Sequence, residues 1–131
     1  MILIDTSIIL DLLKNKDNEK IEKFKKILSL NIPFGINKYI YQEILQGAKN
    51  EKEFNTLDEY LITQKFYDLK NDINSFKESA LLYYKCRKAG LTVKTIDCII
   101  AQTTIENDLY LLHNDKDFEN IASVEPKLKF Y

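Results

Sequence analysis

The sequence predicts an α/β protein, a three-layer α/β/α sandwich around a central, mainly parallel sheet. Short apolar runs alternate along the chain with longer segments in which apolar residues recur at helical spacing. Strands that alternate with helices form parallel sheets covered by helices. The first apolar run, Ile2–Ile4, contains no polar residue, as expected for a strand that is buried on both faces.

The first third of the chain reads as strand, helix, helix, strand and helix. The small polar residues 5–7 follow the first strand and favour a helix start. Apolar residues at helical spacing predict an amphipathic helix over residues 18–30, which ends before Pro33. Residues 34–36 then form a short strand, and Asn37 is the expected N-cap of the next helix.

The middle of the chain is predicted to be mostly helical. A helix is expected over residues 51–61, a third strand over 65–69 and a long helix over 71–89. Asn71 is the expected cap of the long helix, and Gly90 stands where a left-handed C-terminal residue is wanted. The residues expected on the buried side of the long helix are Ile73, Phe76, Ala80, Leu81, Tyr84 and Cys86.

The last third completes the alternation. Thr95 is the expected cap of another helix. Strands are expected over residues 110–113 and 128–130, and Pro126 prevents earlier pairing of the last one. In folds of this kind, ligands bind at the carboxyl ends of the strands.

Composition limits the class of protein. The 131 residues show no repeat or linker, so we expect one domain over residues 1–131. No apolar run approaches the ~18–20 residues that cross a bilayer, and the start lacks the basic segment of a secretion signal. The only cysteines are Cys86 and Cys98, too few for a disulfide scaffold, so we expect a cytoplasmic protein without membrane contact.

The charges nearly cancel, with 19 Lys and Arg against 20 Asp and Glu. This excludes a generally basic nucleic-acid coat protein. Binding to nucleic acid through a local patch or through metal ions remains open. The densest basic cluster comprises Lys85, Arg87, Lys88 and Lys94, and we interpret it as a solvated helix face, with phosphate contact as the alternative.

Four carboxylates are expected near the carboxyl ends of strands. They belong to Asp5, Glu43, Asp97 and Asp115. Clustered carboxylates repel one another unless cations bind. Their hard oxygen ligands suit Mg²⁺ or Mn²⁺, and such ions are the usual means of cleaving phosphodiesters.

Each of these carboxylates also has a structural explanation. Asp5 can cap a helix, Asp97 can complement a helix dipole, and Glu43 can be a surface residue. Asp115 and Asp117 can be solvated turn residues. Asp97, however, has apolar neighbours in the sequence and therefore needs a partner.

Other catalytic classes lack their residues. His113 is the only histidine, which excludes a His-dependent triad or a multi-His zinc site; we interpret it as structural. The three glycines form no phosphate-binding loop. Tyr83 and Tyr84 are interpreted as core or dimer-interface residues, with stacking on RNA bases as the alternative.

Four segments that carry the acidic residues resemble, in order, the motifs of PIN-domain ribonucleases, especially VapC-type toxins. They are residues 2–13, 40–48, 96–103 and 111–121. Each motif is weak alone, but the ordered set is specific and covers essentially the whole chain. Cys98 stands where a small residue such as Ala is usual, and His113-Asn114 replaces a common Thr-Arg or Thr-Asn pair.

The resemblance implies a PIN-like fold and an Mg²⁺-dependent endoribonuclease, with Mn²⁺ as a substitute ion. It places Asp5, Glu43, Asp97 and Asp115 around the metal, with Asp117 sharing or taking the role of Asp115. Thr6 and Ser7 would line the site through a hydroxyl or backbone amide. A metal-activated water would cleave the RNA, so no protein nucleophile is needed.

The resemblance also implies partners. The expected protein is the homodimeric toxin of a toxin–antitoxin pair, which cleaves RNA and binds a small antitoxin in a hydrophobic groove. The alternatives are a housekeeping PIN nuclease in RNA processing and a catalytically silent interaction module with the PIN fold. Retention of four repelling carboxylates argues against the silent module.

Overall fold

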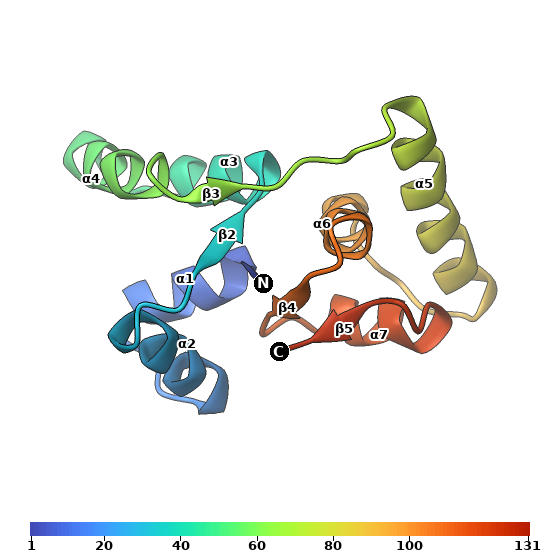
Figure 1. Cartoon of the computed structure of the whole chain (residues 1–131), viewed down its shortest axis with the longest axis horizontal. Coiled ribbons are helices and arrows are strands. Elements are labelled where there is room, and N and C mark those ends of the chain that lie inside the picture. The colour runs from blue at the N-terminus through green and yellow to red at the C-terminus, as the bar shows by residue number, and fades with distance from the viewer.

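The computed structural model describes the whole chain, Met1–Tyr131. It contains five strands and seven helices (Figure 1). In chain order these are β1 (Ile2–Ile4), α1 (Thr6–Leu13), α2 (Glu19–Ser29), β2 (Phe34–Ile36), α3 (Lys38–Gln46), α4 (Glu51–Leu61), β3 (Lys65–Phe66), α5 (Ile73–Lys88), α6 (Thr95–Glu106), β4 (Tyr110–Leu112), α7 (Lys116–Val124) and β5 (Lys129–Phe130).

The strands form one parallel sheet in the order β3-β2-β1-β4-β5. Because crossovers between parallel strands are right-handed, the connections on the two sides of β1 lie on opposite faces. Helices α1–α4 contact one another, as do α5–α7, and Figure 1 shows these two groups at left and right. The predicted α/β/α sandwich is confirmed, and its sheet is entirely parallel.

The core lies where the two central strands are covered on both faces. Leu3, Ile4, Leu111 and Leu112 have no exposed surface, which explains why these positions of β1 and β4 are aliphatic. Small polar residues begin the first four helices: each N-cap side chain accepts a hydrogen bond from a backbone N–H. These N-cap residues are Asp5, Asn18, Asn37 and Asn50.

Helix α5 differs from its prediction. Its buried residues are Ser75, Ser79, Leu82 and Cys86. The small serines let α5 pack closely against α6, where Ser75 Oγ donates to Glu106 Oε1 (2.8 Å). The residues Ile73, Phe76, Ala80, Leu81 and Tyr84 were expected inside but are exposed, because tertiary contact with α6 selects the serine face rather than the apolar one.

Several boundaries also differ. Asp72, with a φ of 51°, precedes α5 without a side-chain cap, so the predicted Asn71 cap is wrong. Thr95 is the first residue of α6, and Lys94 takes the N-cap position. The predicted left-handed residue after α5 is confirmed: Gly90 has a φ of +78°, which glycine adopts without strain.

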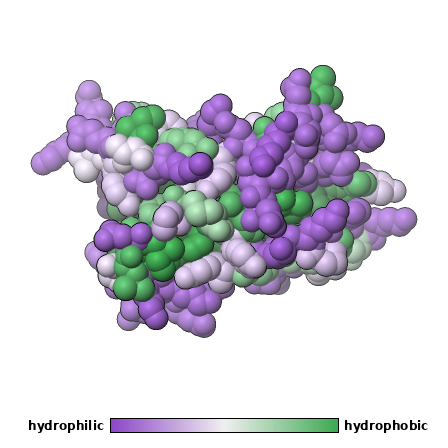
Figure 2. Space-filling view, in the orientation of Figure 1, coloured by the Kyte–Doolittle hydropathy of each residue, from purple (hydrophilic) through white to green (hydrophobic).

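The surface is mostly hydrophilic on the side seen in Figure 1. Figure 2 shows an apolar area at its lower left, over α2 and β2. Single exposed apolar residues are normal in folded proteins. None of the helices has the length and hydrophobicity that a bilayer crossing requires.

Candidate active site

The candidate active site lies between the carboxyl ends of β1 and β4. From β1 the chain crosses toward β2 on one side, and β4 lies on the other. Ligands bind where strand order reverses in this way. The Asp5 backbone N–H donates to Leu112 O (3.0 Å), so the residues that follow both strands are held side by side.

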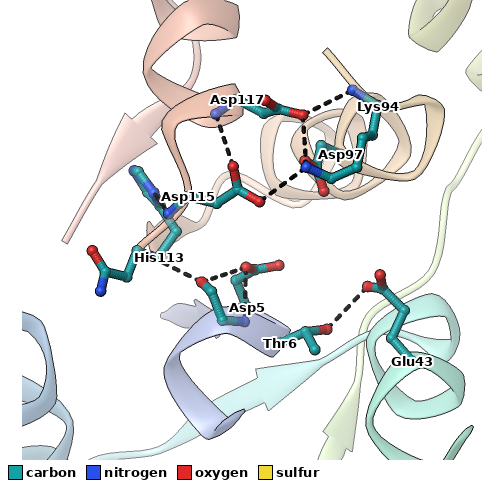
Figure 3. A network of polar contacts seen from close by, with 10 residues as sticks. Asp5, Thr6, Glu43, Lys94, Asp97, His113, Asp115 and Asp117 are labelled. Carbon is teal, nitrogen blue, oxygen red and sulfur yellow. Dashed lines mark hydrogen bonds and ion pairs between the residues drawn. The ribbon is translucent and has the colours of Figure 1, made fainter. Parts of the chain in front are cut away.

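Asp5 is oriented by the start of α1. Its Oδ2 accepts hydrogen bonds from Ser7 N (3.0 Å) and Ser7 Oγ (2.6 Å). Ser7 Oγ in turn accepts from Asn114 N (2.9 Å), which joins the β1 and β4 ends (Figure 3). Burial raises the pKa of Asp5 to about 6 against the lowering effect of the Ser7 hydrogen bonds, and the charges of Glu43 and Asp115 raise it further.

Three aspartates converge beside Asp5. Asp97 lies in the first turn of α6, and Asp115 and Asp117 lie at the start of α7. One oxygen from each lies within 4.8 Å of the others. We call this group the three-aspartate cluster (Figure 3). Oxygens at this separation can bind one divalent cation together.

Asp97 is the most buried member of the three-aspartate cluster. It is 4 % exposed, and its Oδ2 has no hydrogen-bond partner. Burial raises its pKa, and a hydrogen bond shared with Asp117 and the charges of Asp115 and Asp5 add to this. Burial acts in the same direction on Asp117, but the hydrogen bonds from Asp97 and Lys94 outweigh it and lower the Asp117 pKa. The cluster is therefore short of positive charge.

Glu43 reaches the site from α3, across from the cluster. Its Oε1 accepts a hydrogen bond from Thr6 Oγ1 (3.0 Å), which leaves Oε2 free of that contact. Figure 3 shows Glu43 and Asp5 facing the cluster from the other side. Of the four residues expected to act together, Asp97 and Asp115 share the cluster, and Asp5 and Glu43 border it.

Asp115 and Asp117 have different local roles. Asp115 caps α7, since its Oδ1 accepts from Asp117 N (2.9 Å), and its Oδ2 faces the cluster. Asp117 contributes its carboxylate through Oδ2. Both aspartates therefore line the site, where the sequence left open which of them would do so.

Lys94 is the residue that sequence reasoning missed. It was placed in the basic cluster with Lys85, Arg87 and Lys88, but its Nζ lies within 3.3 Å of all three members of the three-aspartate cluster. The three-residue separation from Asp97 was the available signal, because such a pair lies on one side of a helix start.

His113 is structural, as expected. It is 2 % exposed and packs on Phe118 and Phe130, with ring centroids 5.1 and 4.4 Å away. Its Nδ1 accepts from Asp115 N (3.2 Å). Burial, assisted by the charge of Lys20, lowers its pKa to about 4, so the ring is neutral and holds the Asp115 turn.

Comparisons with known proteins identify the family of this chain. Residues 2–124 match the PIN domain family. The chain is 30% identical to Ribonuclease VapC11 of Mycobacterium tuberculosis over 126 residues, which cover 95% of this chain and 93% of that protein. A VapC ribonuclease of Mycobacterium bovis shows the same identity and coverage.

Solved structures share the fold over the whole chain. VapBC2 from Rickettsia felis, bound to a promoter DNA fragment, has a TM-score of 0.74 at 19% identity and covers 100% of this chain and 98% of its own. A toxin–antitoxin complex from Klebsiella pneumoniae has a TM-score of 0.68 at 25% identity, with coverage of 99% and 100%. The chain, with its acidic site at the β1–β4 edge, therefore belongs to the PIN domain family.

Proposed function

We propose that this protein is a metal-dependent endoribonuclease that acts as the toxin of a toxin–antitoxin pair. The observation that carries the proposal is Asp97, a buried carboxyl whose Oδ2 has no hydrogen-bond partner and which stands among further carboxylates. A buried carboxylate oxygen without a hydrogen bond destabilises the fold, and the one ammonium group near it, that of Lys94, is shared with Asp115 and Asp117. A bound cation would neutralise these grouped carboxylates, whereas a helix-capping role does not explain why they lie together.

The donor set fits a divalent ion of the hard type. The side chains grouped closely enough to hold an ion are all aspartates, and the chain has no second histidine. Cys86 and Cys98 are buried and do not belong to this group. Carboxylate oxygens suit Mg²⁺, with Mn²⁺ as a substitute. Asp97, Asp115 and Asp117 would hold the ion, and Asp5 and Glu43 would complete its surroundings or those of a second ion.

Each residue of the site has a separate role in the proposed hydrolysis of the phosphodiester bond. When bound, the metal supplies the Lewis acidity that activates water and stabilises the leaving oxygen. Ser7 fixes the direction of the Asp5 carboxylate. Thr6 fixes Glu43 through Oε1, so that Oε2 can accept a proton from water. No histidine takes part, because His113 is buried and neutral.

The biological role is inferred from the relatives. Ribonuclease VapC11 is 30% identical to this chain, and a solved structure with the same fold is a toxin–antitoxin complex. We therefore propose an RNA substrate, a small antitoxin and a cytoplasmic site of action. We also propose a homodimer, for which the exposed apolar side chains of α5, Ile73, Phe76 and Tyr84, offer a surface.

Cleavage of a total-RNA pool tests the proposal. Wild type is incubated with Mg²⁺ or with excess chelator, beside Asp97→Asn and the matched surface variant Asp108→Asn. We expect cleavage only with Mg²⁺, loss of it in Asp97→Asn, and normal cleavage by Asp108→Asn, whose side chain is 92% exposed. Sequencing the ends of the products identifies the RNA.

Other outcomes select an alternative. Folded, metal-loaded protein that cuts no RNA would favour the silent interaction module. Cleavage by a protein whose expression leaves cell growth unaffected, with no small antitoxin gene beside its own, would favour a housekeeping nuclease. Cleavage by Asp97→Asn at the wild-type rate would contradict the assigned site.

A further inference from the structure

Lys94 occupies the centre of the three-aspartate cluster. Its Nζ lies 3.3 Å from Asp97 Oδ2, 3.3 Å from Asp115 Oδ2 and 3.0 Å from Asp117 Oδ2 (Figure 3). It is the only basic side chain that forms an ion pair with these three residues. The ammonium group therefore stands among the oxygens that are close enough together to hold a metal ion.

The contact with Asp97 is an ion pair of limited quality. Asp97 Oδ2 lies 3.3 Å from the ammonium nitrogen, yet it has no hydrogen-bond partner and its side chain is 5% exposed. A cation without directional requirements satisfies such an oxygen better than an ammonium group that serves three carboxylates. The missing hydrogen bond of this buried oxygen is an observation separate from the grouping of the aspartates, and it also indicates a ligand at this position.

The lysine is attached so that only its side chain needs to move. The Lys94 backbone N–H donates to Asp117 Oδ2 (2.8 Å), which fixes the main chain before α6. The side chain is 62% exposed, so its ammonium group can leave the cluster for solvent without any change in the core. A metal ion at these oxygens would repel the ammonium group and require that movement.

We propose that Lys94 is an internal cation that occupies the site in the metal-free protein and is displaced by the divalent ion. This rests on the proposed function, because it assigns the metal site to the same carboxylates. Lys94 thereby stabilises the metal-free fold and weakens metal affinity by the same free energy, since coupling between two ligands of one site is reciprocal. It sets the metal concentration at which the site fills.

Two substitutions test the coupling. Lys94→Met removes the charge and keeps a similar stem length. The control Lys129→Met makes the same change beside Asp108 and Tyr110, at the amino ends of β4 and β5, away from the site. Titration calorimetry with Mn²⁺ should show about tenfold tighter binding for Lys94→Met and no change for Lys129→Met. In chelator, Lys94→Met should also unfold at a lower temperature than wild type, because its carboxylates repel one another. Unchanged or weaker Mn²⁺ binding by Lys94→Met would overturn the proposal.

Displacement itself is read by acetylation of lysine amines in wild type, followed by mass spectrometry. Acetylation of Lys94 should increase when saturating Mg²⁺ replaces chelator, whereas acetylation of Lys129 stays constant. If Mg²⁺ binds and RNA is cleaved but Lys94 stays equally protected, displacement is wrong and the proposed function stands. If calorimetry detects no metal binding at all, both fail.

Discussion

Replacing Asp5 by asparagine should stabilise the metal-free protein at alkaline pH while removing its activity. Asp5 is 3 % exposed, and its pKa is raised from 3.8 to about 6, mainly by burial. A raised pKa means that the folded state holds the proton more tightly than the unfolded chain. Stability from this group is complete below pH 3.8 and is lost as the pH rises through about 6.

The magnitude follows from the two pKa values. Each pH unit between them corresponds to about 1.4 kcal/mol, so ionised Asp5 costs the metal-free fold about 3 kcal/mol at pH 8. Asparagine carries no charge and keeps one oxygen for the Ser7 donors, but its amide N–H groups need partners in a buried place. A net gain of about 2 kcal/mol, or about 7 °C in Tm, is expected for a chain of this length.

Thermal unfolding in chelator at pH 5 and pH 8 measures the effect. The gain of Asp5→Asn should be about 2 kcal/mol at pH 8 and fall to about 0.6 kcal/mol at pH 5, where folded Asp5 is mostly protonated but the unfolded carboxyl is already ionised. Asp108→Asn changes an aspartate whose side chain is 92% exposed, and it should shift Tm equally at both pH values. If Asp5→Asn loses stability at pH 8 as much as at pH 5, burial of the charge is not what raises the Asp5 pKa, and the reasoning is refuted.

Three further substitutions test the packing. Gly35→Ala should destabilise the fold by about 2 kcal/mol in chemical denaturation, because the new Cβ would clash with the Tyr67 ring and lie 2.8 Å from Lys65 O; unchanged stability would contradict this. His113→Ala should cost about 2–4 kcal/mol by loss of packing, and the pH profile of wild-type cleavage should show no histidine titration near pH 6.5; a titration there that His113→Ala removes would make the ring functional. Phe76→Glu places a charge on the exposed apolar face of α5 and should shift a dimer toward monomer in sedimentation velocity; an unchanged mass would exclude this face as the interface.

Features with local causes were predictable from the sequence. Asp5 and Asn37 were expected to cap helices, and both do so through their own side chains. The apolar runs of β1 and β4 predicted central strands, because only a strand covered on both faces lacks polar residues. The order of strands and acidic residues then predicted that the carboxylates gather at the carboxyl ends of the parallel strands, where Asp5 and Asp97 lie.

Features that depend on neighbours distant in the chain were not predictable. In α5 the apolar residues pointed to one face, but contact with α6 buried Ser75 and Ser79 instead, since close helix packing favours small side chains. Lys94 belonged by sequence to a basic surface, and only the approach of α7 to α6 brought Asp115 and Asp117 around it.

The sequence by itself determined the alternation of strands and helices, their caps and the positions of the carboxylates, because these depend on residues within a few places of one another. The tertiary structure alone decided which helix faces are buried, which oxygens share a site and which cation occupies it. Burial and Coulomb interactions act through space, and residues such as Lys94 and Asp117, 23 positions apart, meet only once the sheet has formed between its helices.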